Sequence, residues 1–230
     1  MHSHFDTYLN IESLIRSYQP KTVLELGANK GDNTKKLLKL SEELDYRLTV
    51  VSPEYPYLAN ISTNNQLTIS RYKFEHVNLN WIYGVSYIEL SSMDNESIDF
   101  CILDTDHNYW TLKKELLELR RVLSEGGIVA IHDTEEFSDK NGIQELGYFK
   151  TINSINSYTV DGDVLNMLDV SVSGIGIDYP IEKIKAETRP YPQAIMDTVP
   201  DWPIVRETKE SNGAVALLKA TEDGVPSDVK

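Results

Sequence analysis

Five short apolar runs, separated by longer amphipathic stretches, set the pattern of the first 135 residues. They cover residues 22–26, 47–52, 81–83, 98–103 and 128–133. Runs of this length, flanked by glycine, proline and polar residues, are typical of buried strands. Strands that alternate with helices along a chain predict a parallel sheet with helices on both faces. We therefore expect an α/β fold, a Rossmann-like doubly wound sheet.

The stretches between these runs have helical periodicity. Apolar residues recur every three or four positions over residues 6–18, 32–44 and, most clearly, 109–123. The apolar face of the last segment consists of Leu112, Leu116, Leu119 and Leu123. A stripe of this kind predicts a helix that packs against the sheet.

The alternation stops after residue 136. Residues 137–188 are polar, contain glycine and asparagine, and lack a clear period. Such a stretch is too long for a bare loop in a compact domain, so we expect an inserted lid or subdomain on the ligand side of the sheet. Residues 53–80 give no clear assignment either. Aromatic residues in or beside the insertion, among them Tyr191, either stack on a ligand or pack the insertion onto the body.

Regular structure resumes near the end of the chain. A helix is expected near 191–199, and two strands follow over 203–208 and 214–220. Because their connection is so short, these two strands must pair antiparallel, which adds a hairpin at one edge of the parallel sheet. We expect a single domain over residues 1–220, followed by a frayed tail over 221–230.

Composition narrows the choice of partners. The chain has 230 residues and a formal net charge of -14, so phosphate-rich surfaces would repel it. We therefore expect a small-molecule ligand, neither nucleic acid nor a membrane, and leave a homo-oligomer open. Cys101 is the only cysteine, which excludes an internal disulfide or a thiolate cage around a metal. The sequence begins without a secretion signal and has no run of 18 apolar residues, so we expect a cytoplasmic protein.

Residues 22–34, TVLELGANKGDNT, join a buried strand to a helix through a sharp turn. Gly27 allows a tight turn that a ligand can approach closely, and Gly31 lets the helix begin nearby. Their G-x-x-x-G spacing is neither that of a dinucleotide site nor that of a P-loop. Glu25 would repel a pyrophosphate, so the pattern favours a ligand with an amino group and a nucleoside. A plain strand–helix turn capped by Asp32 is the alternative.

A second group of polar residues follows the next strands. Asp104, Asp106 and His107 come directly after the fourth strand, and His132 and Asp133 end the fifth. Neighbouring parallel strands end at the same edge, so these residues should form an oxygen-rich cluster able to bind Mg²⁺, while imidazole better suits Mn²⁺ or similar ions. A neutral imidazole of His107 or His132 is a candidate general base. The alternative is a set of turn and cap residues.

These segments resemble a known family. LELGANKGDNT, the stretch from FCILDTDHNYW to GGIVAIHDT, and WPIVRET with NGAVALLK are similar to the class I S-adenosylmethionine (SAM)-dependent methyltransferases. Within that class, they resemble the branch of macrocin O-methyltransferases and cephalosporin-hydroxylase-like enzymes. In that branch a strand ends in D-G-D-H-x-Y, and a GG turn leads to a strand ending in H-D. Thr105 stands for the glycine, and the matching residues are Asp104, Asp106, His107, Tyr109, Gly126, Gly127, His132 and Asp133.

The resemblance implies SAM as the cofactor, bound along the carboxyl ends of the strands. The implied cofactor-binding residues are Glu25, Gly27, Ala28, Asn29, Gly31, Asn33, Thr34, Ser52, Glu54, Gly84, Val85, Ser86 and Asp104. The resemblance also implies a divalent metal, Mg²⁺ or another, bound by Asp104, His132 and Asp133 and bridged to substrate oxygens. The implied catalytic residues are His107, His132 and Asp133.

Two positions depart from the family pattern. Ser52 replaces the acidic residue that usually holds the ribose, with Glu54 two residues later as a substitute. In Gly84-Val85-Ser86, valine replaces the acidic residue that usually meets the adenine amino group. A hydrogen bond to a charged group is worth about 1.5–3 kcal/mol. Cofactor binding would therefore weaken by one to several factors of ten unless other residues compensate.

The expected function is SAM-dependent O-methylation of a small hydroxylated acceptor, a sugar or glycosylated metabolite. Assistance by a divalent metal is left open. The alternative is a non-catalytic methyltransferase-like module for binding or assembly, because Ser52 and Val85 leave the adenosine without its usual anchors. A Rossmann-type oxidoreductase is disfavoured by the glycine spacing.

Overall fold

The computed structural model describes residues 9–28, 31–52, 57–61, 66–71, 76–105, 107–135, 157–160, 163–166, 186–187, 189–210 and 212–220. Their strands form two sheets, one of seven strands and one of four. Asn29, Glu54 and Asp106, and the tail over 221–230, lie outside the described residues.

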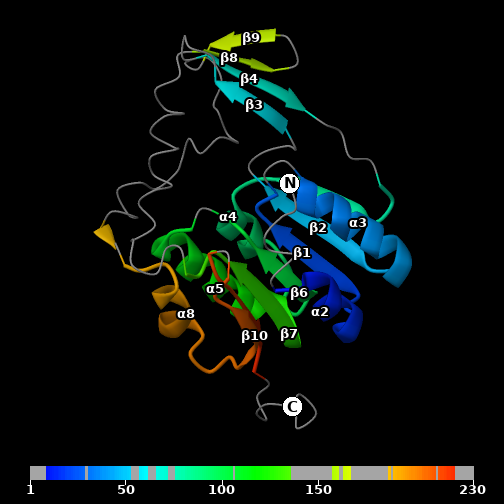
Figure 1. Ribbon diagram of the computed structural model, residues 1–230, viewed down its shortest axis with the longest axis vertical. Coiled ribbons are helices and arrows are strands. Elements are labelled where there is room, and N and C mark those ends of the chain that lie inside the picture. Colours follow the sequence, from blue (N-terminus) through cyan, green and yellow to red (C-terminus); the bar gives the residue numbers. More distant parts are fainter. Residues whose placement is uncertain are drawn as a thin grey trace.

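The larger sheet is built on the buried apolar runs (Figure 1). Its order is β10-β11-β7-β6-β1-β2-β5. The parallel strands are β1 (Thr22–Leu26), β2 (Arg47–Ser52), β5 (Leu79–Tyr83), β6 (Ile98–Leu103) and β7 (Leu123–His132). From β1 the chain proceeds through β2 to β5 on one side, and then through β6 to β7 on the other. In doubly wound sheets such a reversal marks where ligands bind, here at the carboxyl ends of β1 and β6.

An antiparallel hairpin completes this sheet. It consists of β10 (Ile204–Thr208) and β11 (Ala214–Leu218), and β11 pairs antiparallel with β7. The predicted doubly wound sheet with a hairpin at its edge is confirmed.

Helices cover both faces of the larger sheet (Figure 1). One face packs against α2 (Ile11–Tyr18) and α3 (Asp32–Leu44). The other packs against α4 (Ser86–Ser91), α5 (Tyr109–Val122) and α8 (Gln193–Thr198). Side chains alternate along β1, so Leu24 and Leu26 join the α5 side of the core and Val23 joins the α3 side. Glu25 therefore points toward α3.

Element boundaries differ from the predicted ones in a few places. Helix α2 begins at Ile11, because Asn10 adopts a left-handed conformation and its side chain accepts a hydrogen bond from Ser13 N–H. Strand β5 starts two residues earlier than its apolar run, and α8 is shorter than expected. Strand β7 begins at Leu123 and includes the Gly126–Gly127 turn, where its register against β6 shifts.

The smaller sheet combines two distant parts of the chain. Its strands, in order, are β3 (Tyr57–Ile61), β4 (Gln66–Arg71), β8 (Ser157–Val160) and β9 (Asp163–Asn166). Hairpin β3–β4 follows β2, hairpin β8–β9 follows β7, and β4 pairs in parallel with β8. Most of the lid predicted over 137–188 lies outside the described residues, so the lid stays a prediction.

Within the described ranges, no helix has both the length and the apolar character needed to cross a membrane.

Candidate active site

The turn after β1 is shaped by the neighbouring backbone. Gly27 has φ +82°, and its N–H donates to Val51 O at 2.9 Å. A Cβ on Gly27 would overlap the carbonyl group of Asp104, whose own N–H donates to Leu26 O at 3.0 Å. Glycine is thus required here because the end of β6 approaches the turn. The prediction that a ligand approaches this turn closely stays a prediction.

A buried carboxylate lies beneath the turn. Glu25 is 1% exposed and accepts hydrogen bonds from Thr34 Oγ1 at 2.5 Å and from Asn33 Nδ2 at 3.2 Å. Gly31 caps α3 with φ +74°, which brings both donors over β1. Burial raises the pKa of Glu25 to about 7, although the two hydrogen bonds oppose that shift. The side chain is therefore poised to ionise near neutral pH.

Glu25→Gln is expected to stabilise the fold above pH 7. An acid whose pKa rises from 4.5 to about 7 on folding holds its proton more tightly in the folded state. Its stabilising contribution is complete below pH 4.5 and is lost as the pH rises to about 7. That shift corresponds to about 3 kcal/mol, and glutamine, which stays neutral, avoids the loss. Thermal unfolding followed between pH 4.5 and 8 measures it.

The melting temperature of the variant should exceed that of the wild type by roughly 5–10 °C at pH 8 and converge toward it at pH 4.5. Glu207→Gln, at an exposed position on the edge strand β10, is the matched control and should leave the pH dependence unchanged. Parallel pH curves for wild type and Glu25→Gln would contradict this account of Glu25.

The ends of β1, β2 and β5 are tied together. Ser52, which is 1% exposed, accepts a hydrogen bond from Ala28 N–H on its hydroxyl at 3.4 Å. Gly84 N–H donates to Ser52 O at 3.2 Å. Ser86 is buried, and its hydroxyl donates to Glu115. Ser52 thus supports the glycine turn, and the hydroxyl of Ser86 points into the protein, while the cofactor contacts predicted for both residues stay predictions.

Four polar side chains meet at the ends of β6 and β7. Each of Asp104, His107, His132 and Asp133 contributes one atom to a group whose members all lie within 4.8 Å of one another. His107 Nε2 lies 3.0 Å from Asp104 Oδ1 and 3.2 Å from Asp133 Oδ2. His132 Nδ1 lies 3.4 Å from Asp104 Oδ1 and 3.2 Å from Asp133 Oδ1. The predicted assembly of these residues at one sheet edge is found, and His107 joins the predicted metal ligands.

The backbone of this cluster is unusual. His107 has φ +46° and Asp133 has φ +56°, the left-handed region that residues other than glycine seldom adopt. Such conformations cost about 1–3 kcal/mol each and concentrate at functional sites. The turns that follow β6 and β7 are therefore strained in a way that aims both side chains at Asp104 and His132.

The contacts between the carboxylates and the imidazoles determine the protonation states of the cluster. Burial would lower the pKa of His132, but its contacts with Asp104 and Asp133 outweigh this and raise the pKa to about 9. Burial would also raise the pKa of Asp104, yet His107 and His132 hold that pKa well below its usual range. At neutral pH the cluster therefore combines an ionised Asp104 with a protonated His132.

Three further polar or aromatic residues were not assigned to the site from the sequence. Tyr191 is fully buried, and its ring meets that of His107 edge-on, with the centroids 5.8 Å apart. Glu115 is fully buried on α5 and accepts hydrogen bonds from Ser86 and, at 3.2 Å, from Thr105 Oγ1. Glu115 could have been recognised, because it falls on the leucine stripe of α5. Glu89, on α4, is considered below.

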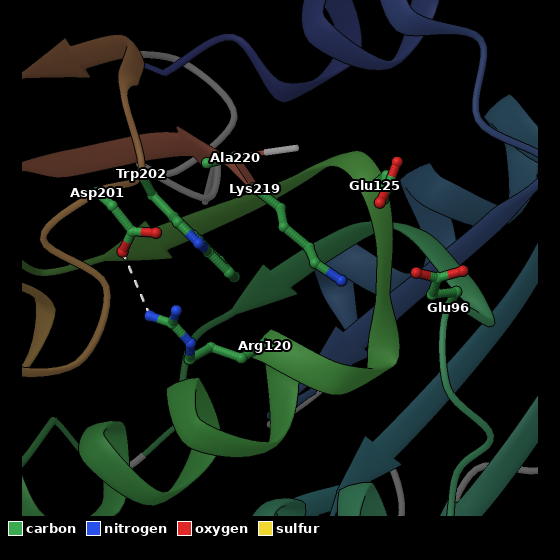
Figure 2. Close-up of a pocket in the computed structure, with 7 residues that line it drawn as sticks. All are labelled: Glu96, Arg120, Glu125, Asp201, Trp202, Lys219 and Ala220. Atoms are coloured by element: carbon green, nitrogen blue, oxygen red, sulfur yellow. Dashed lines mark hydrogen bonds and ion pairs between the residues drawn. The ribbon is translucent and has the colours of Figure 1, made fainter. Parts of the chain in front are cut away.

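A cavity of about 310 Å³ lies elsewhere, near the amino-terminal ends of β6 and β7 (Figure 2). It is lined by Glu96, Arg120, Glu125, Asp201, Trp202, Lys219 and Ala220. Its two cations are already bound to carbonyl groups, because Arg120 donates to Thr198 O at 2.8 Å and Lys219 to Leu123 O at 2.6 Å. These contacts tie α5 to neighbouring segments. The cavity faces away from the strand ends that carry the cluster.

The central region of the chain is similar to a known sequence family. Residues 24–134 match the model of a family described as a methyltransferase domain. The match begins in β1 and ends just after Asp133, so it includes the glycine turn and all four cluster residues. A search of curated protein sequences found no match.

The chain was also compared with solved structures. A Staphylococcus aureus protein, provisionally assigned by its name as a caffeoyl-CoA O-methyltransferase, aligns with a TM-score of 0.52 and 14% identity over 92% of this chain and 81% of its own. The Podospora anserina methyltransferase PaMTH1, bound to S-adenosylhomocysteine (SAH), aligns with a TM-score of 0.46 and 16% identity, over 89% and 74%. A SAM-dependent methyltransferase from Methanosarcina mazei aligns with 0.45 and 13%, over 91% and 98%. The first alignment shows a shared fold.

Proposed function

We propose that this chain is a SAM-dependent methyltransferase that methylates a hydroxyl oxygen of a small acceptor such as a sugar or glycosylated metabolite, and the matched domain and the fold support this. One observation carries the proposal. The four-residue cluster lies at the carboxyl edge of the sheet directly beside the glycine turn, since Asp104 contacts Gly27 through the backbone. The histidines proposed to accept a proton are thus adjacent to the glycine turn at which we propose that the cofactor binds.

The residues around the glycine turn are suited to SAM. Gly27, directly after β1, and Gly84, directly after β5, carry no side chains, and the hydroxyl of Ser52, at the end of β2 between them, is turned to the loop. Glu25 and Asp104 supply negative charge close to the turn, which suits the amino group and the sulfonium of the cofactor's methionine end. Asn29 and Glu54, outside the described residues, stay predicted contacts. SAM supplies an electrophilic methyl group on its sulfonium.

The cluster is also suited to a divalent metal. It offers two carboxylates and two imidazoles, whose candidate ligand atoms all lie within 4.8 Å of one another. Two nitrogen donors favour Mn²⁺, Fe²⁺ or Zn²⁺ over Mg²⁺. Asp104, His107, His132 and Asp133 would hold the ion. A metal there lowers the pKa of a bound substrate hydroxyl.

The residues of this chain would move the acceptor's proton. When the cluster holds no metal, the hydroxyl proton would pass to an imidazole of His107 or His132, and Asp104 and Asp133 would stabilise the imidazolium that results. The raised pKa of His132 reflects this stabilisation. It also means that His132 must first lose its proton before it can serve as the base. As the new O–C bond forms, the S–C bond of SAM breaks and SAH leaves.

A non-catalytic binding or assembly module is the second candidate. It is favoured by the position of Ser52, whose hydroxyl is engaged with Ala28, and by the apolar side chain at Val85. In that case the fold would remain while cofactor affinity would be lost.

Calorimetric titration with SAM and SAH separates the two candidates. A methyltransferase should bind both with dissociation constants of roughly 1–100 μM, in the range usual for enzyme ligands. Titration should be repeated with 1 mM Mn²⁺, followed by transfer of a labelled methyl group to a panel of sugars and glycosylated phenols. Absence of binding at millimolar SAM and SAH would overturn the catalytic proposal in favour of the module.

A further inference from the structure

The carboxylate of Glu89 lies against Gly84. Glu89 is in the first turns of α4, where side chains lean toward the start of the helix. A Cβ placed on Gly84 would come within 2.6 Å of both Cγ and Cδ of Glu89. The absence of a side chain at Gly84 is therefore what lets this carboxylate fold back over the end of β5.

This carboxylate has no protein partner among the residues that the structure describes. Glu25 accepts two hydrogen bonds, and Glu115 accepts them from Ser86 and Thr105. Glu89, by contrast, is half-buried, and no hydrogen bond or ion pair of its side chain occurs in the described part of the chain. A charged group that loses part of its water without a partner destabilises the protein. A carboxylate kept in this position points to a ligand with hydrogen-bond donors.

The backbone connects Glu89 to the cofactor turn. Ala28 N–H donates to Ser52 Oγ, and Gly84 N–H donates to Ser52 O. The ends of β1, β2 and β5 therefore form a row, with the glycine turn at one end and the Glu89 carboxylate at the other. A nucleoside whose sugar lies beside β2 would bring its base to the end of β5.

We propose that Glu89 is the residue that selects adenine, accepting a hydrogen bond from the exocyclic amino group of SAM. This inference rests on the proposed use of SAM. It places the acidic group on α4, four residues after Val85, where the loop itself carries valine. Ser86 cannot take that role, because its hydroxyl is turned to Glu115. A carboxylate accepts from the amino group of adenine but repels the carbonyl oxygen at the same position of hypoxanthine.

The test compares SAH with S-inosylhomocysteine, which carries a carbonyl oxygen in place of the amino group. Calorimetric titration of the wild type should show at least tenfold tighter binding of SAH. Glu89→Ala should weaken SAH binding about tenfold and leave the two ligands nearly equal. Glu89→Gln, which can also donate to a carbonyl oxygen, should bind S-inosylhomocysteine more tightly than the wild type does. Glu207→Gln, on the opposite edge of the sheet, should behave as the wild type.

Two results would overturn the inference while leaving SAM binding intact. One is an unchanged preference for SAH in Glu89→Ala. The other is that Glu89→Ala still binds SAH more tightly than S-inosylhomocysteine but no longer binds SAH more tightly than its 2′-deoxy analogue. That result would assign Glu89 to the ribose. Failure of the wild type to bind SAH at all would instead overturn the proposed function, and this inference with it. Circular dichroism confirms that each variant is folded.

Discussion

Replacing Asp104 by alanine is expected to weaken Mn²⁺ binding by about 100-fold or more. Asp104 Oδ1 lies 3.0 Å from His107 Nε2 and 3.4 Å from His132 Nδ1, so one carboxylate orients both imidazoles. Its removal takes away one candidate ligand and releases the orientation of two others, and the loss of an orienting partner alone commonly costs 10–100-fold in metal affinity. Electron paramagnetic resonance of free Mn²⁺ during titration measures the change.

Asp94→Ala, at an exposed position before β6, is the control and should leave Mn²⁺ affinity unaltered. The buried cluster loses charge in Asp104→Ala, so thermal unfolding should be recorded beside the titration to show that the variant is folded. Equal Mn²⁺ binding by wild type and Asp104→Ala would remove the cluster from consideration as a metal site. Methylation that proceeds without metal would then rest on the histidines alone.

The second large effect is expected at the turn after β1. Gly27→Ala must place a side chain at φ +82° and within 2.8 Å of the carbonyl carbon of Asp104. The left-handed conformation alone costs an alanine about 1–2 kcal/mol, and backbone atoms of two paired strands cannot move apart without breaking the sheet. We expect a loss of roughly 3 kcal/mol or more in the free energy of unfolding, a size that single substitutions reach only through such overpacking. Urea denaturation measures it.

Gly126→Ala provides a matched control. Gly126 has φ +70°, close to that of Gly27, but a Cβ placed there meets no atom within 4 Å. Its substitution should therefore cost only the conformational strain, about 1 kcal/mol. Equal destabilisation by the two variants would show that strain, and not the contact with Asp104, explains the requirement for glycine at position 27.

Much of the candidate site was accessible from the sequence because it depends on strand ends. Asp104 and Asp133 each follow a buried run, and adjacent parallel strands bring their carboxyl ends to one edge. The protonation of the cluster was not accessible in the same way. The pKa of His132 depends on distances to Asp104 and Asp133 that spacing along the chain does not determine. The roles predicted for the individual residues stay predictions.

Two further residues, Glu115 and Glu89, were not recognised as notable from the sequence. Glu115 was not distinguished from the charged residues around it, although it is fully buried beneath Ser86 and Thr105. Glu89 acquires its position only because α4 directs it back over Gly84. The contacts of Glu115 join α5 to Ser86 at the start of α4 and to Thr105 after β6, whereas the contact of Glu89 folds α4 back onto the turn that precedes it.

Local periodicity by itself determined the central strands of the larger sheet, because β1, β2, β6, β7 and β11 contain apolar runs whose burial does not depend on which strand lies beside them. Tertiary structure alone decided the smaller sheet, since β4 and β8 pair across more than eighty residues and neither carries a clear pattern of its own. It also decided that Asp104 closes over Gly27 and that two carboxylates share two histidines. Burial is encoded residue by residue, whereas the pairing of distant segments and the charge of clustered groups arise only when the chain brings them together.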